Sequence, residues 1–529
     1  MIKGFRQIAL LTATSRVFGL VRDIAYGHFF GAGKLLDAWI IAFRIPNLSR
    51  RLFGEGAASA SFIPVYSAEL ESDKEKAAVL ANTVVTVLFV VLAALVPLGE
   101  GAIWGYRLLV QESDETRLIL SLSSIMLPYM LFVCLVAMLA GILNVHRHFA
   151  SPAAAPIVLN LCIIGTILLS GWGLGMSAMQ QLFFVAVAVL IAGLLQIAIQ
   201  IPPLIRSGVR LRPAWDVHAR AFRNVLLLMG PMIIGLTVTQ INTLADDLIA
   251  WWFSGSEEKT AFFEFLGRRI RYPMWRGSVS HLYYAQRLYQ LPLGVLGISL
   301  ATAIFPVMSS DAARKDYDAL RRTIARGLRG TVFVAVPATV GLIIVARPLI
   351  RAAFQHGKFS AEDTSMVVMT LTFYALGLTG YFSQQILARA FYAAQDSRTP
   401  MRSALIAVAA NFALNLILIW FLGRAGLACA TAICSYVQVA ILLIVLRKWL
   451  GPAILRGMGT TAIKTAGATA VMSLVGWGLL KLFGSLPDSR TFDIVRLVAI
   501  VPCAAITYAV VARALRSAML DLLASRGGR

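Results

Sequence analysis

Long apolar stretches recur from one end of the chain to the other, and they restrict its fold more than any other feature. A helix needs about 20 mainly apolar residues to cross a bilayer. Fourteen such segments can be drawn, at 5–30, 35–66, 78–110, 118–146, 152–172, 178–204, 222–253, 282–308, 328–350, 364–394, 401–422, 425–446, 459–484 and 491–515. Only 14% of the residues are charged, whereas soluble domains carry roughly 25%. We therefore predict an all-α polytopic membrane protein with about 14 transmembrane helices.

Basic residues outnumber acidic ones and gather in alternate loops. The net charge is +22, from 48 Lys and Arg against 26 Asp and Glu. Loops after even-numbered segments are basic, as at Arg210 and Arg212, whereas loops after odd-numbered segments are mostly short, acidic or neutral, as at Glu112 and Asp114. Because cytoplasmic loops carry the excess of Lys and Arg, we predict that both termini are cytoplasmic. This explains the positive charge without a nucleic-acid partner.

Sequence motifs of catalysis, metal binding and nucleotide binding are missing. The chain has no HExxH, GxSxG, Walker A or dinucleotide fingerprint, and its six histidines are scattered. None of the five cysteines forms a CxxC pair, so we expect neither a disulfide nor a bound metal. Residues 1–22 lack a small-residue cleavage site and are expected in the mature protein. We predict a non-enzymatic transporter without a cofactor, driven by an ion gradient or the membrane potential.

Ionisable residues stand inside the first two apolar segments, where lipid would not accept them. They are Arg16, Arg22, Asp23, Asp37, Arg44, Arg50, Arg51 and Glu55. An arginine at the centre of a bilayer helix costs about 2.5–3.5 kcal/mol, so this cluster is expected to border a water-filled cavity. A planar guanidinium matches phosphate, and several together suit a diphosphate. The alternative is that these charges pair with each other or reach the membrane ends.

Helix geometry refines this expectation. Arg16 and Arg22 are six positions apart, so they are offset by roughly 120° and can border a wide cavity without forming one narrow stripe. Pro46 lacks an N–H and clashes with the preceding turn, which predicts a helix break at 44–47. Broken helices at membrane depth are tolerated where they line cavities.

Two further polar groups lie in segments seven and eight. Asp246 and Asp247 are paired acids inside an apolar run, and they either hold a cation, neutralise an arginine or lie near the outer boundary. Segment eight carries Ser280, His281, Tyr283, Tyr284, Gln286, Arg287 and Gln290, which favour either a cavity lining or an interfacial anchor. Asn160, Asn411 and Asn415 are interpreted as hydrogen-bonding links between helices.

A charged insertion at about 254–277 interrupts the alternation of loop charge. It mixes acids and arginines with aromatic residues, and by alternation it lies on the outer face. We interpret it either as an amphipathic interfacial helix or as a tolerated loop insertion.

Several motifs together resemble the MurJ/MviN lipid II flippase family. They are SRVFGLVRD at 15–23, Asp37 with Ala38, IPNLSRRLFGEGA at 45–57, FIPV at 62–65, SVS at 278–280, YYAQRL at 283–288, PLGVLG at 292–297, FQHGKF at 354–359 and FYAAQD at 391–396. The motif at 45–57 is the most specific, and the resemblance extends to about residue 450. An acidic residue is frequent in the family where this chain has Gln290, and the insertion is longer than the usual loop.

The resemblance implies two six-helix lobes around a central cavity, at 1–204 and 205–450, and two further helices at 451–529. It implies transport of lipid II, the undecaprenyl-diphosphate disaccharide-pentapeptide, across the bacterial cytoplasmic membrane by alternating access. The residues that match its functional positions are Arg16, Arg22, Arg50, Arg287, Asp37, Glu55 and Ser280. Expected partners are lipid II, membrane lipids and cell-wall synthesis proteins, with Asp23, Asp246 and Asp247 as candidates for a coupling cation or for charge balance.

Two other functions stay open at this point. An exporter of another polyprenyl-linked oligosaccharide or of drugs would carry fewer arginines and more acids in its cavity. A scaffold for cell-envelope assembly would use the charges, and the insertion at 254–277, for protein contacts.

Overall fold

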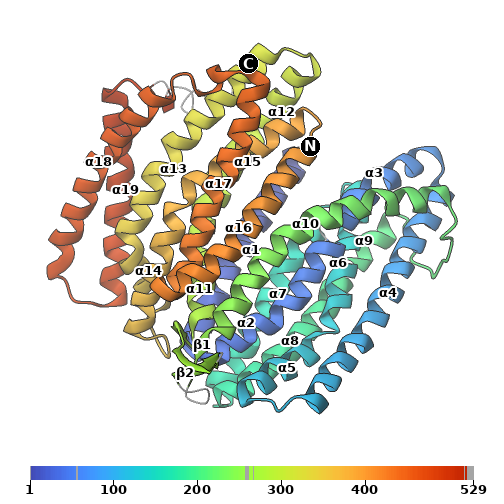
Figure 1. The fold of residues 1–529 in the computed structure, drawn as a ribbon. Helices are drawn as coiled ribbons and strands as arrows, with labels where there is room; N and C mark the ends of the chain where they lie inside the picture. The colour runs from blue at the N-terminus through green and yellow to red at the C-terminus, as the bar shows by residue number, and fades with distance from the viewer. Residues whose placement is uncertain (1, 55–56, 257–260, 266, 518, 521–529) are drawn as a thin grey trace. The chain divides into compact units, whose positions relative to one another are not determined.

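The computed structural model describes residues 2–54, 57–256, 261–265, 267–517 and 519–520. Within this part the chain is almost entirely helical, and helices occupy every apolar segment predicted above (Figure 1). The chain forms two compact units, Met1–Leu244 and Ala245–Arg529. The division falls inside the helix Arg220–Trp252, whereas the boundary expected at 204/205 lies inside the short helix Ile201–Arg206 that precedes it.

The polytopic character of the protein is confirmed. Ten described helical segments are long and apolar enough to cross a membrane, and an eleventh qualifies if α5 and α6, bent by 42°, form one span. The segments predicted at 5–30, 35–66 and 222–253 do not meet this test within the described residues. The count of fourteen spans therefore stays a prediction.

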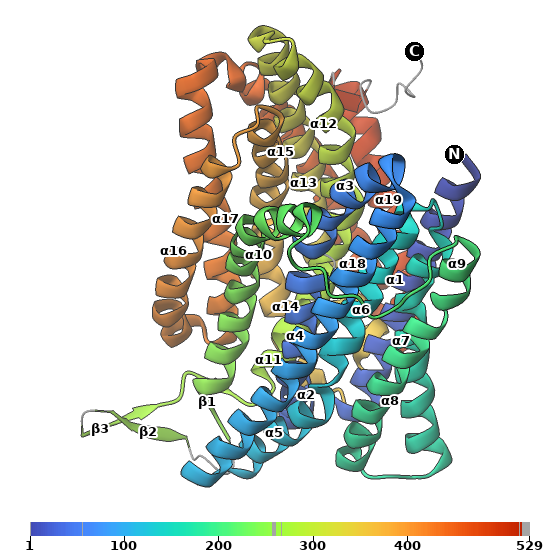
Figure 2. The ribbon, with the colours of Figure 1, turned by 90° about the vertical axis from the view of Figure 1, so that its right-hand side faces the viewer.

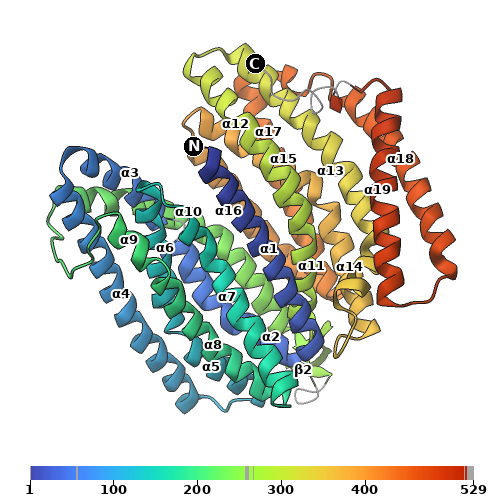
Figure 3. The same ribbon diagram turned by 180° about the vertical axis from the view of Figure 1, so that it is seen from behind.

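The first unit is built from long helices. They are α1 (Ile2–Phe30), α2 (Lys34–Ser49), α3 (Ala57–Ser72), α4 (Lys74–Leu109), α5 (Asp114–Met126), α6 (Tyr129–Val145), α7 (Ala150–Leu168), α8 (Ala178–Ala198), α9 (Ile201–Arg206) and the start of α10 (Arg220–Trp252). Single π-helical turns follow α2 and α7, at η1 (Arg50–Gly54) and η2 (Leu169–Gly173). Helix α1 runs alongside α7, as Figure 3 shows from behind.

Side-chain caps account for several helix starts in this unit. The carboxylate of Asp73 accepts hydrogen bonds from the backbone N–H groups of Glu75 and Lys76 and starts α4. Ser177 and Gln180 form a reciprocal capping box at α8. Each cap satisfies N–H groups that have no partner within the helix.

The helix break predicted at 44–47 is wrong. Helix α2 continues through Pro46 to Ser49 and passes directly into the π-helical turn at Arg50. The wider i→i+5 turn accommodates the absence of a hydrogen-bond donor at Pro46, so the helix does not end there. A π-turn is thus placed at the Arg50–Arg51 pair, one turn after the proline.

The second unit contains the remaining helices. They are α11 (Ser278–Pro292), α12 (Ile298–Ala313), α13 (Tyr317–Phe354), α14 (Ala361–Leu376), α15 (Leu378–Ala393), α16 (Arg398–Leu422), α17 (Arg424–Leu450), α18 (Met458–Leu482) and α19 (Arg490–Ala514). Short turns join them at η3 (Leu293–Gly297), η4 (Pro452–Leu455) and η5 (Phe483–Ser485). The last two helices, α18 and α19, pack against α13 (Figure 1).

The amphipathic helix considered for the insertion at 254–277 is wrong for the described residues. They form four short strands, β1 (Ser254–Gly255), β2 (Phe262–Phe265), β3 (Arg268–Arg271) and β4 (Met274–Trp275). Strands β2 and β3 pair antiparallel, and β1 pairs with β4. Exposure alternates along β2, with Phe262 and Glu264 exposed and Phe263 half-buried between them, which is the two-residue period of a strand and not that of a helix.

Candidate functional site

Arg22 is buried in the first unit and is fully engaged by its neighbours. Its Nε and Nη2 donate to Oδ1 of Asp23 at 3.1 and 2.8 Å, and its Nη1 donates to Oδ1 of Asn160 on α7 at 3.0 Å. The guanidinium also lies 5.6 Å from the centre of the Tyr26 ring. Asp23 therefore balances the charge of Arg22, and Asn160 links two helices as predicted.

Asp37 is buried beside an aromatic stack. Its residue is 1% exposed. The rings of Trp39 and Phe43, on the same helix, stack with centres 5.6 Å apart, and Phe43 stacks on Tyr129 of α6 at 6.1 Å. The ring stack joins α2 to α6, and Asp37 lies two positions before Trp39 on α2, on another side of the helix.

The other predicted cavity residues of this unit differ in exposure. Arg16 is exposed on α1, and Arg50 is half-buried in the π-turn. Arg51 is exposed and donates from Nη1 to Oε1 of Gln240 at 2.9 Å. Glu55 lies outside the described residues. Arg16 and Arg50 thus carry exposed or half-buried guanidinium groups, whereas that of Arg22 is buried and paired with Asp23.

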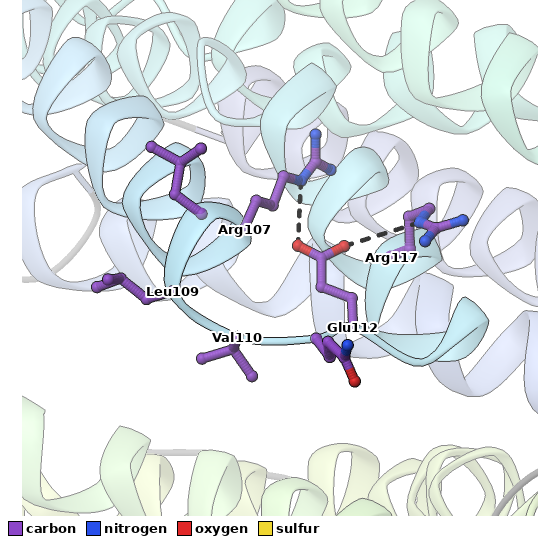
Figure 4. Close-up of a pocket in the computed structure, with 7 residues that line it drawn as sticks. Arg107, Leu109, Val110, Glu112 and Arg117 are labelled. Carbon is purple, nitrogen blue, oxygen red and sulfur yellow. Dashed lines mark ion pairs between the residues drawn. The ribbon is translucent and has the colours of Figure 1, made fainter.

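A surface pocket of about 620 Å³ opens where α4 turns into α5 (Figure 4). Glu112 lies between two arginines in it, 3.5 Å from Nε of Arg107 and 3.9 Å from Nε of Arg117. None of the residues predicted as a site lines this pocket. Because both of its arginines are already paired with Glu112, we assign it no part in substrate binding.

In the second unit, Asp246 belongs to a chain of hydrogen bonds between helices. Nδ2 of Asn415 donates to Oδ1 of Asp246 at 2.6 Å and to Oδ1 of Asn411 at 2.9 Å. Nδ2 of Asn411 donates in turn to Oγ1 of Thr431 at 3.3 Å. Asp247, like Asp246, is 2% exposed. The chain joins α10, α16 and α17 through oxygen-rich side chains.

Three tyrosines form a second aromatic wall, in the same unit. The ring centre of Tyr289 is 4.8 Å from that of Tyr374 and 5.3 Å from that of Tyr381. Gln286 donates from Nε2 to the hydroxyl of Tyr374 at 3.1 Å. These residues tie α11 to α14 and α15.

Ser280 and Arg287 lie on α11, which is two turns long between them. Seven positions place two residues on nearly the same helix face, about 10 Å apart along the axis. Ser280 is fully buried, whereas Arg287 is exposed, donates to the hydroxyl of Tyr283 at 3.2 Å and lies 4.8 Å from the centre of that ring.

A hydrogen-bonded triad around the buried His281 was not predicted from the sequence. Nη1 of Arg424 lies 2.7 Å from Nδ1 of His281, and Nε2 of His281 lies 2.9 Å from Oδ1 of Asp363. Because arginine only donates, Nδ1 accepts and Nε2 carries the proton to Asp363. The three residues come from α17, α11 and α14. The sequence signalled only the histidine, as a polar residue at the start of segment eight.

The sequence matches a family model described as lipid II flippase MurJ over residues 26–491. A relative named probable lipid II flippase MurJ from Vibrio cholerae is 33% identical over 455 residues, which cover 84% of this chain and 82% of the relative. Another from Rhizobium meliloti is 34% identical over 462 residues, covering 85% and 81%. The lipid II flippase MurJ of Burkholderia cenocepacia is 31% identical over 463 residues, covering 85% and 84%.

Solved structures agree with the sequence comparison. A lipid II flippase MurJ in an inward closed conformation has a TM-score of 0.74 and 26% identity, over 96% of this chain and 99% of that chain. An inward-facing multidrug resistance MATE transporter has a TM-score of 0.65 at 12% identity, over 84% and 98%, which shows the shared fold alone. From the family model and the similarity of relatives along most of their length, the chain belongs to the MurJ family of lipid II flippases, which are transporters and not enzymes.

Proposed function

We propose that this protein is a lipid II flippase, which moves the undecaprenyl-diphosphate-linked peptidoglycan precursor from the inner to the outer leaflet of the cytoplasmic membrane. The observation that carries the proposal is the family match over residues 26–491. The likeness to a MurJ structure along nearly the whole of both chains supports it. The direction of transport follows from the need for the precursor outside the membrane.

We further propose the finer architecture that the resemblance implies. Fourteen helices would form two six-helix lobes and a final pair, with both termini in the cytoplasm. Alternating access would let the sugar-peptide head group cross while the prenyl tail stays in lipid. Contacts with cell-wall synthesis proteins stay a prediction.

We infer that arginines of the first unit bind the diphosphate. Arg16 and Arg50 present guanidinium groups that are exposed or half-buried and can approach a ligand. Arg22 is buried and held by Asp23 and Asn160, so it acts on the ligand by exchanging partners or by setting the local field. We extend the role to Asp37, Glu55, Ser280 and Arg287 on the family resemblance.

Complementation tests this proposal. Wild-type protein is expected to restore growth and lipid II exposure at the outer leaflet in a strain depleted of its own flippase. Arg50→Ala and the double variant Arg22→Ala, Asp23→Ala, which removes the buried pair together, are expected to abolish rescue at normal protein level. Arg210→Ala, which changes an exposed arginine in a connecting loop, is expected to retain rescue. Failure of the wild-type protein to restore lipid II exposure would contradict the function. Normal rescue by both cavity variants would contradict the site alone.

We propose that Asp246 and Asp247 hold a coupling cation or balance a charge during transport. Support comes from their burial and from the side-chain oxygens of Asn411, Asn415 and Thr431 nearby. Asp23 is the alternative acid, but it faces Arg22. Asp246→Asn is expected to remove any dependence of transport on the cation present, which is measured by replacing sodium with potassium or choline in proteoliposomes. Unchanged cation dependence in this variant would place the coupling elsewhere.

A further inference from the structure

The insertion between α10 and α11 is held firmly at its base. Oγ of Ser254 donates to the carbonyl of Ala250 at 2.6 Å and lies 3.2 Å from that of Trp275. Arg276 donates to the carbonyl of Trp251, and its guanidinium lies 5.1 Å from the centre of that ring. These contacts close the end of α10 and fix where the β2–β3 hairpin leaves the helices.

One face of the hairpin packs against other residues of the second unit. Its register places Phe263 opposite Ile270, so their side chains share one face. The ring centre of Phe263 lies 4.9 Å from that of Tyr272 and 6.3 Å from that of Trp420, at the end of α16. The carbonyl of Pro273 stands against Gly423 in the turn that follows.

The opposite face is exposed, cationic and aromatic. The register pairs Phe262 with Arg271 and Glu264 with Arg269, and all four residues are exposed. Arg268 at the start of β3 is exposed as well, at the turn end of the hairpin and on the side of the strand that carries Ile270. Among the ion pairs recorded between described residues, none involves the three arginines of β3. Three positive charges against one carboxylate leave this hairpin with a net positive surface.

The hairpin lies at the level where membrane-spanning helices end. Helix α16 passes the test for a span and ends at Leu422, close to the Trp420 ring on which the hairpin packs. Exposed aromatic residues gather there, with Trp252 67%, Phe262 49% and Trp275 45% exposed. Figure 2 shows β2 and β3 projecting sideways, across the direction of α10 and α16. Aromatic side chains are enriched at the headgroup level of membranes.

We propose that the β2–β3 hairpin is an anchor that binds the phosphate headgroups of anionic phospholipids at the membrane face where α16 ends. Arginines bind phosphate, and basic segments are attracted to anionic surfaces within a screening length. The exposed Phe262 ring supplies the apolar contact. The occupant is the phospholipid of the surrounding leaflet. This surface is separate from the diphosphate site proposed above.

Amide hydrogen exchange of the full-length protein in nanodiscs tests the anchor. Peptides covering β2 and β3 are compared in phosphatidylcholine alone and in phosphatidylcholine mixed with phosphatidylglycerol. Each net positive charge strengthens binding to an anionic surface by about fivefold. The hairpin has a net charge of two, so we expect its amides to exchange on the order of 25-fold more slowly in the anionic discs. At about 1 M salt, where the screening length is about 3 Å, the difference disappears.

Charge variants identify the groups responsible. The triple variant Arg268→Gln, Arg269→Gln, Arg271→Gln removes the difference between the two lipids. The matched triple variant Arg210→Gln, Arg212→Gln, Arg220→Gln changes net charge equally at exposed positions of the first unit and retains it. Phe262→Ser keeps the salt-sensitive difference in amide protection between the two lipids and lowers the protection that remains at high salt. Equal exchange in both lipids, or an unchanged lipid effect in the hairpin variant, overturns the proposal, as does protection that requires an added protein.

Discussion

At the scale of single residues, the buried charge of Arg22 in the first helix is neutralised by the neighbouring Asp23. Arg22 and Asp23 are adjacent in sequence, yet both are buried, at 8% and 3% exposure. Removing one member of a buried pair leaves an uncompensated charge, which costs about 3–5 kcal/mol. The pair thus stabilises the fold, and this role can be separated experimentally from any role in substrate binding.

Stability measurements separate these two parts. Arg22→Ala is expected to lower the unfolding free energy by about 3–5 kcal/mol, because Asp23 loses its partner. The double variant Arg22→Ala, Asp23→Ala is expected to recover most of this loss and still fail to support growth. Thermal unfolding in detergent and complementation measure the two effects. A double variant as unstable as the single one would show that the pair is not the cause.

At the scale of elements, α16 and α17 approach each other closely at the turn that joins them. A Cβ at Gly426 would lie 2.5 Å from the carbonyl oxygen of Leu418, which is backbone and cannot turn away. Gly423 begins this pair with a φ of +55°, a conformation that favours glycine. Small residues let helix backbones approach closely inside membranes.

Substitution at these glycines tests the packing. Gly426→Ala is expected to destabilise the protein by roughly 1–3 kcal/mol, because the two helices must separate. Gly341→Ala is the control, since a Cβ there meets nothing within 4 Å, and it is expected to add about 0.5–1 kcal/mol of stability. The midpoint of thermal unfolding compares them. Equal midpoints would mean that α16 and α17 adjust freely.

A salt-bridge network fixes the last two helices to α13. Arg351 donates to Asp493 from Nε at 2.8 Å and from Nη2 at 2.6 Å, and its Nη1 lies 2.7 Å from Asp488 in the α18–α19 loop. Arg496 adds a contact to Asp493 at 2.8 Å. The hydrogen bond from Arg351 lowers the pKa of Asp488 below its ordinary value.

This network predicts an acid-sensitive end of the hairpin formed by α18 and α19. The pKa of Asp488 is lower in the folded protein than in the unfolded chain, where it is about 4. The carboxylate therefore stabilises the folded state fully above that unfolded pKa, and this stabilisation is lost as pH falls through the folded pKa. Below about pH 4 the amides of the α18–α19 loop are therefore expected to lose protection, measured as their exchange rate relative to the intrinsic rate at the same pH. Asp488→Asn is expected to exchange faster already at neutral pH and to lose this step. Asp114→Asn, which changes an exposed acid of the first unit, leaves the acid-induced step in the α18–α19 loop unchanged.

At the scale of the whole molecule, we expect transport of a charged lipid to couple to the membrane potential. Each charge moved through the field changes the driving force by about 2.3 kcal/mol per 100 mV. Dissipating the potential in proteoliposomes is therefore expected to slow lipid II transport by the fully active protein. Transport that is equally fast with and without a potential would mean that no net charge crosses the field in the slow step.

The amino-acid sequence determined the membrane class, the positions of the helices and the family. Apolar length and the cost of charge in lipid are local properties, so the approximate places of the segments and the unusual Arg16–Glu55 region could be predicted without a structure. The helix ends could not, since the segment predicted at 328–350 belongs to the longer helix Tyr317–Phe354. The motifs at 15–23 and 45–57 sufficed for the resemblance that the family model later confirmed.

Only the tertiary structure decided which polar groups meet. Asn160 reaches Arg22 across 138 positions, and Arg424 reaches His281 across 143, because helix packing brings distant turns together. The hairpin at 262–271 and the π-turn after Pro46 also needed the structure. A side chain's partner depends on the neighbouring helices that exclude water around it, and this information is absent from the local sequence.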